Sequence, residues 1–155
     1  MRLSEEYGIV NVFKPADNQD GVTGDSINTK YCDHVTYLLS CGALTGDAVL
    51  TVKSGASDGT ETTAETFYYR LAGADQAATG ADVYAAETSA TTLTLTAATY
   101  DNKILIIEVP VDKLTEGQPF LTLALSDAAS VHTSSCVAIL SGMRYKANQS
   151  PSVIA

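Results

Sequence analysis

The alternation of apolar and polar side chains constrains the fold of this chain more than any other feature. Between residues 92 and 96 threonines alternate with Leu93 and Leu95, so an extended strand would turn its leucines to one face and its threonines to the other. This period of two is typical of half-buried β-strands. It returns at residues 31–42, 48–55 and 119–127, and three further strand-like segments, residues 63–73, 103–111 and 134–145, carry apolar side chains on both faces. The chain is therefore predicted to be all-β.

The number of expected strands, about eight, and the turn residues between them indicate how the strands are arranged. Their spacing favours an antiparallel β-sandwich or jelly roll, with a closed barrel as the second choice. A chain of 155 residues can bury one self-sufficient core. The short turn at residues 44–47 predicts that the strands on either side form an antiparallel hairpin. Pro110 should end its strand, and residues 111–117 resemble a single helical turn closed by Gly117.

Three regions are expected along the chain. Residues 1–30 read as an extended N-terminal arm and loop, residues 31–147 as the β-sandwich domain, and residues 148–155 as a loose C-terminal tail. The apolar Val10, Val12 and Phe13 leave two interpretations open. They dock, as an edge strand or on a neighbouring subunit, or they belong to a leader without a role.

Net charge indicates which classes of partner the protein can bind, and cysteine content indicates the redox compartment in which it folds. Nine basic residues against 18 acidic ones give a formal charge of -9, which disfavours nucleic acid and anionic membranes and favours a neutral or basic protein surface. No segment approaches the roughly 20 apolar residues of a membrane-spanning helix. Three cysteines and no secretory signal predict buried free thiols in a reducing compartment.

Residues that could perform chemistry are few. Neither His34 nor His132 has metal-ligand spacing to a cysteine or to another histidine. His132 and Cys136 share a strand face, but at roughly 3.3 Å per residue they lie about 13 Å apart, too far for a nucleophile and base. We therefore expect no catalytic residue, no metal and no cofactor. Tyr68 and Arg70 share a face of one strand and could contact a partner.

Several sequence passages, taken in order, resemble a known family. They are a hairpin with a glycine-containing turn, a strand ETFYYRL, the passage ILIIEVPVDKLTEGQPF and a terminal apolar strand ending in Arg-Tyr. This order of strands and turns, over residues 31 to 145, resembles that of capsid decoration (cement) proteins of tailed bacteriophages.

The resemblance implies a function without catalysis. A decoration protein sits on the outer surface of the phage head as a homotrimer, bridges major capsid protein subunits, and is assembled in the bacterial cytoplasm. We expect shell contacts from Tyr7, Val10, Phe13 and Lys14, which are apolar or basic within an acidic segment. A tail-tube, tail-terminator or head-completion protein is the alternative, as is a receptor- or glycan-binding jelly roll.

Overall fold

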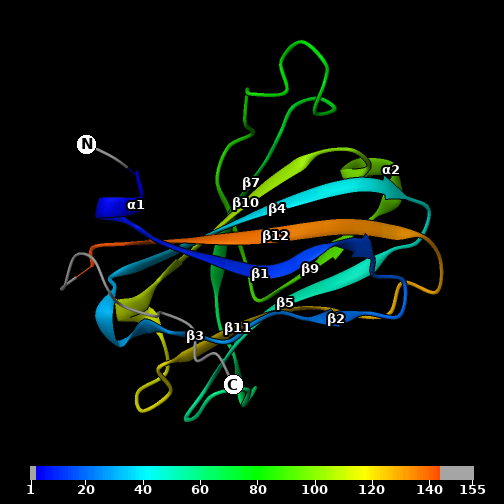
Figure 1. Ribbon diagram of the computed structural model, residues 1–155. Helices are drawn as coiled ribbons and strands as arrows, with labels where there is room; N and C mark the ends of the chain where they lie inside the picture. The colour runs from blue at the N-terminus through cyan, green and yellow to red at the C-terminus, as the bar shows by residue number, and fades with distance from the viewer. Residues whose placement is uncertain (1–2, 144–155) are drawn as a thin grey trace.

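A computed structural model describes residues 3–143 and shows two antiparallel sheets packed face to face (Figure 1). The helical turns are α1 (Leu3–Glu6), η1 (Thr29–Tyr31), α2 (Ala97–Tyr100) and η2 (Val111–Lys113). The strands are β1 (Gly8–Asp17), β2 (Val22–Thr23), β3 (Ile27–Asn28), β4 (His34–Leu44), β5 (Ala48–Gly55), β6 (Thr63–Ala64), β7 (Phe67–Leu71), β8 (Thr88–Ala90), β9 (Thr92–Leu95), β10 (Ile104–Pro110), β11 (Phe120–Leu125) and β12 (His132–Ser141). The all-β prediction is confirmed.

The strand order is that of a jelly roll. One sheet runs β1-β12-β4-β10-β7-β8 and the other β2-β11-β5-β6, with β3 also on β11 and β9 also on β5. Along the chain, β1 pairs with β12, β2 and β3 with β11, β4 with β10, and β5 with β9. A long hairpin wound around itself gives this nesting. The segment between β5 and β9 is an insertion into this jelly-roll order. Its strands β7 and β8 extend the first sheet beyond β10.

The core lies between the two sheets and follows the alternation in the sequence. On β4, every second side chain from Val35 to Cys41 is fully buried, and on β11 Leu121 and Leu123 are buried opposite them. Each such leucine contributes roughly 1.5–3 kcal/mol relative to an exposed one. The expected strand ends are also present, since β10 stops at Pro110 and a 3-10 turn follows it.

The predicted hairpin across residues 44–47 is wrong. Strand β4 pairs with β10 and β12, whereas β5 pairs with β9 and β11, so the turn is a corner that carries the chain from one sheet to the other. Both Leu44 and Ala48 are buried, so both strands turn their apolar faces to a shared core. Two carboxylates hold the corner: Asp101 accepts a hydrogen bond from the Leu44 N–H, and Asp47 accepts one from the Ala97 N–H, each at 2.8 Å.

Residues 8–17 form an edge strand, which confirms the first of the two interpretations left open for this segment and contradicts a leader without a role. Strand β1 pairs with β12, and the carbonyl of Val12 accepts a hydrogen bond from the Asp25 N–H at 2.9 Å. The register shifts between Asn11 and Phe13. This irregularity lets the adjacent Val12 and Phe13 both face the core, which breaks the period of two that identifies a strand in sequence. The expected tail, residues 148–155, lies outside the described residues.

Candidate protein-docking face

The outer surface of the first sheet carries a continuous apolar area, although it faces away from the core. Strand pairing aligns outward-facing residues into rows across the sheet. One row runs Ile9, Ile139, Thr36, Glu108, Tyr68, and the next runs Asn11, Val137, Leu38, Ile106, Arg70. The neighbouring strands β1, β12 and β4, blue, orange and cyan, are seen side by side in Figure 1. We define the apolar outer face as the six aliphatic residues Ile9, Leu38, Ile104, Ile106, Val137 and Ile139.

These aliphatic side chains remain accessible in the single chain. Ile9 is 50% exposed and Val137 is 37% exposed. The other four are half-buried. Isolated exposed aliphatic residues are ordinary, but contiguous ones on a sheet face mark a site of interaction.

The second sheet provides an internal comparison. Several of its outward positions are polar, among them Thr51 and Lys53 on β5 and Thr92 and Thr94 on β9; the apolar exceptions are Val49 on β5 and Phe120 and Ala124 on β11. The first sheet therefore has the more aliphatic outer face of the two. This asymmetry is a property of the sequence and not of the fold.

Charges lie at the border of the apolar outer face. Arg70 on β7 pairs with Glu87 at 3.7 Å, and His34 on β4 approaches Glu108 on β10 at 3.8 Å. All four side chains are about one-third exposed or more, so each pair contributes little to stability. Both signs of charge are therefore available to a partner at the rim.

A loop bounds one end of this face. Gln76, in the segment between β7 and β8, donates hydrogen bonds to the Ser40 hydroxyl at 3.0 Å and the Cys41 carbonyl at 2.7 Å. The contact leaves a hollow of about 540 Å³ between residues 75–77 and the sheet. Beyond this contact the segment rises away from the sheet as the green loop in Figure 1.

The structure separates the six residues singled out in the sequence. Tyr68 and Arg70 share the outer side of β7 and continue the two rows, and their contact with a partner stays a prediction. Val10 and Phe13 point into the protein's own core, so their prediction as surface contacts is corrected: β1 uses them to close the sandwich. Lys14 is exposed and Tyr7 half-buried on the same edge, and their contact with a shell stays a prediction.

Sequence reasoning missed the apolar outer face itself. Its residues come from four strands that are distant in sequence, and only the register aligns them. A signal was present in β10, where Ile104 and Ile106 lie outward between inward-facing Leu105 and Ile107. Apolar residues on both faces indicate a strand covered on both sides, and the second cover is absent from residues 3–143.

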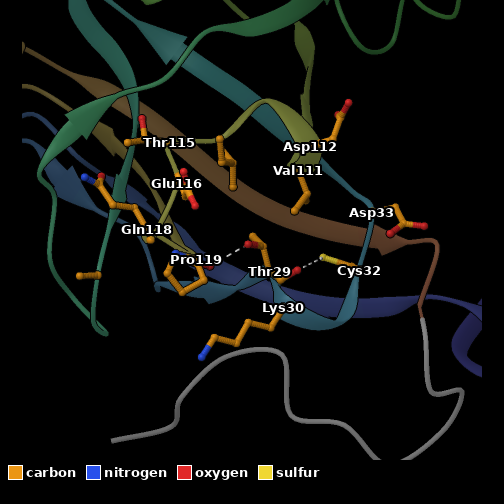
Figure 2. A pocket seen from close by; sticks show the side chains of 13 residues that line it. Thr29, Lys30, Cys32, Asp33, Val111, Asp112, Thr115, Glu116, Gln118 and Pro119 are labelled. Carbon is orange, nitrogen blue, oxygen red and sulfur yellow. Dashed lines mark hydrogen bonds between the residues drawn. The ribbon is translucent and has the colours of Figure 1, made fainter.

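A second concave region lies at one end of the sandwich. A hollow of about 700 Å³ lies between the turn at residues 29–33 and the loop at residues 111–119, and Figure 2 shows the side chains that line it. The Pro119 carbonyl joins its two walls by accepting hydrogen bonds from the Thr29 hydroxyl at 2.7 Å and the Thr29 N–H at 2.8 Å. Lys30 and several carboxylates line the hollow without converging on one another. The hollow is therefore concave but has no cluster of polar groups positioned to bind a ligand.

The cysteines and histidines show no activated group. Burial raises the pKa of Cys32 to about 11, with Asp33 adding to the effect, and burial, assisted by Asp101, raises that of Cys41 to about 12. Burial also raises the pKa of the Cys136 thiol and lowers that of His132, whose two ring nitrogens have no hydrogen-bond partner. These thiols stay protonated near neutral pH, the opposite of what a nucleophile needs.

Residues 3–143 contain neither a cluster of metal-ligating side chains nor a helix that could cross a membrane. No group of three or more His, Cys, Asp or Glu side chains within that range is arranged to hold a metal ion. None of the helices described there has the length and apolar character needed to cross a membrane.

Comparison with known proteins identifies a similar fold but no family. No protein-family model and no curated protein matches the chain. Among solved structures, the SPBc2 prophage-derived protein YomS is similar, with a TM-score of 0.50 at 7% sequence identity. The match covers 86% of this chain and 93% of YomS. At this identity the likeness is one of fold.

Proposed function

We propose that this protein is a structural component of a tailed-bacteriophage virion, a decoration protein that binds the outside of the head and bridges major capsid protein subunits. The observation that carries the proposal is the apolar outer face on an otherwise complete sandwich. A protein that acts alone in water has no use for six accessible aliphatic residues on one sheet. A protein that works within an assembly does.

Two further observations favour a phage assembly. YomS, which shares the fold, is prophage-derived, and the sequence passages from residue 31 to 145 are similar to phage decoration proteins. The formal charge of -9 favours neutral or basic protein surfaces over DNA or anionic lipid. The partner that we propose is therefore the outer surface of the protein shell. The function requires no catalytic residue, cofactor or metal.

The edge formed by β1 is our candidate for contact with the shell. Lys14 is an exposed cation in a strongly acidic chain, and Tyr7 lies half-buried at the start of the same strand. Tyrosine supplies a large amphipathic contact with few rotatable bonds, which suits an interface. Val10 and Phe13 support this edge from inside by fixing β1 to the core.

A direct test mixes the purified protein with undecorated phage heads and measures binding by co-sedimentation. We expect saturable binding of the wild-type protein and regular added density over the head in negative-stain images. Lys14→Glu should weaken binding, whereas Lys113→Glu, which changes an exposed lysine on η2, should not. Rings or tubes of the protein alone, with no binding to heads, would instead indicate a tail-tube protein and would overturn the proposal.

A further inference from the structure

We infer that the hollow lined by residues 29–33 and 111–119 binds an extended segment of a partner protein, one that carries an apolar side chain between basic residues (Figure 2). The inference goes beyond the proposed function, which places the contact with the shell at the β1 edge. Three features of the hollow support it: an apolar floor, an acidic rim, and walls that hydrogen bonds hold in place.

The floor of the hollow is apolar. Val111 and Leu114 are half-buried, because they pack against the core on one side and line the hollow on the other. The half-buried Pro119 and the buried Cys32 also line it. At about 700 Å³, the hollow lies within the range of roughly 300–1,000 Å³ that encloses drug-sized ligands. It therefore has room for an apolar side chain and the backbone that carries it.

The rim of the hollow is acidic. Asp33, Asp112 and Glu116 are exposed on it, and Lys30 is the one cation among the described lining residues, so these four give a formal charge of −2. A negative rim attracts lysine and arginine and repels phosphate groups. The floor and the rim together therefore favour a protein segment with an apolar anchor and basic flanks over nucleic acid or a phosphorylated ligand.

The positions of the three carboxylates favour an extended segment over a compact ligand. Figure 2 shows Asp33, Asp112 and Glu116 spread along the two walls and not gathered at one point. A compact ligand needs polar groups that converge on it. An extended chain, which advances about 3.3 Å per residue, contacts separate side chains one at a time along its length. It can therefore use carboxylates that do not converge.

The walls of the hollow are fixed before anything binds. Thr29 joins them through its two hydrogen bonds to the Pro119 carbonyl, at 2.7 and 2.8 Å. The second wall is also held from the interior, since the Thr115 N–H donates a hydrogen bond at 2.9 Å to Glu65, a side chain that is only 7% exposed. A preformed site loses less conformational entropy on binding than a loop that has to become ordered. The hollow therefore needs little reorganisation to accept a segment.

Peptide titration with a matched pair of variants tests the inference. The probe is the peptide Gly-Arg-Leu-Arg-Gly with blocked ends, and binding to the full chain is followed through the NMR shifts of its backbone amides. Asp112→Lys reverses a charge on the rim, whereas Asp82→Lys makes the same change at an exposed aspartate between β7 and β8. Both variants change the net charge equally, so only an effect at the hollow distinguishes them. Thermal unfolding checks that each variant is folded.

We expect saturable binding of the probe, with shift changes at residues 29–33 and 111–119. Asp112→Lys should weaken binding by about 3-fold or more relative to Asp82→Lys, because it replaces an attraction by a repulsion. A peptide with serine in place of leucine should bind about 10-fold more weakly, and one with glutamates in place of the arginines should not bind. Glu116→Lys should act as Asp112→Lys does and keeps the test valid if that variant fails to fold.

Three outcomes would overturn the inference: no saturable binding at about 5 mM peptide, equal weakening by Asp112→Lys and Asp82→Lys, or equal binding of the leucine and serine peptides. Binding that appears only when residues 144–155 are deleted would assign the hollow to that segment of the chain and would also contradict it. The assay contains no phage heads. A protein that binds heads but not the peptide would therefore reject this inference alone, and one that binds the peptide but not heads would reject only the proposed function.

Discussion

Glu65 should stabilise the loop between β10 and β11 through a single oxygen atom. Its carboxylate lies in the interior between β6 and β7, and Oε1 accepts hydrogen bonds from the Ser54 hydroxyl at 2.5 Å and the Thr115 N–H at 2.9 Å. Gln118, in the same loop, is 2.8 Å from the Ser54 hydroxyl. Glu65 therefore connects the loop that lines the hollow in Figure 2 to β5 of the second sheet.

Two substitutions of Glu65 separate its charge from its hydrogen bonds. Both Glu65→Gln and Glu65→Met remove the charge and keep an unbranched side chain of similar length. Glutamine retains a carbonyl oxygen that can accept from both donors, and methionine retains none. The two variants therefore differ by two neutral hydrogen bonds of about 0.5–1.5 kcal/mol each. We expect Glu65→Met to be less stable than Glu65→Gln by about 1–3 kcal/mol.

Urea unfolding followed by circular dichroism measures this difference. A control is Ser54→Ala, which removes one of the two donors. It should cost less in the Glu65→Met background than in the wild type, because the hydroxyl has already lost that acceptor. Equal unfolding free energies for Glu65→Met and Glu65→Gln would refute the reasoning, since the hydrogen bonds to Oε1 would then contribute nothing.

Three further predictions concern two buried side chains and a pair of glycines. Burial lowers the pKa of His132 from 6.5. The contribution of neutral His132 to the free energy of unfolding is therefore complete above pH 6.5 and declines as the pH falls from 6.5 toward the lowered pKa. Urea unfolding between about pH 7.5 and 5.5 should show this decline in the wild type and a smaller one in His132→Phe. Cys41, with a pKa of about 12, should react with a thiol reagent at pH 8 more than about 100-fold slower in the folded protein than in urea, and equal rates would contradict its burial. Gly142 and Gly59 both have positive φ, but only at Gly142 would an added Cβ lie 2.7 Å from Asp33, so Gly142→Ala should lose about 1–3 kcal/mol more than Gly59→Ala in thermal unfolding.

The sequence predicts strands well here and predicts their partners poorly. Alternation identifies β4, β9 and β11 because their periods are regular. The corner at residues 44–47 was mistaken for a hairpin because a short turn between two alternating segments looks the same whether the strands pair or face each other across a core. For β1 the sequence left an edge strand and an idle leader equally open, because its irregularity hides the period.

The candidate site was only partly predictable for a related reason. Tyr68 and Arg70 were placed on the correct face because the period of two fixes which side chains share a face within one strand. The apolar outer face depends on alignment between strands that are as far apart in sequence as Ile9 and Ile139. Register is a tertiary property, and the local pattern of one strand does not contain it.

The nesting of the first strand against the last has a consequence for synthesis. Strand β12 fills the position between β1 and β4. The β1 edge of the first sheet and the core beneath it are therefore incomplete until about residue 141 has left the ribosome. Topologies rich in such distant pairings fold slowly. Val137 and Ile139 arrive with that last strand, so a nascent chain lacks the centre of its apolar outer face. Only a finished chain could then present the complete face to a partner.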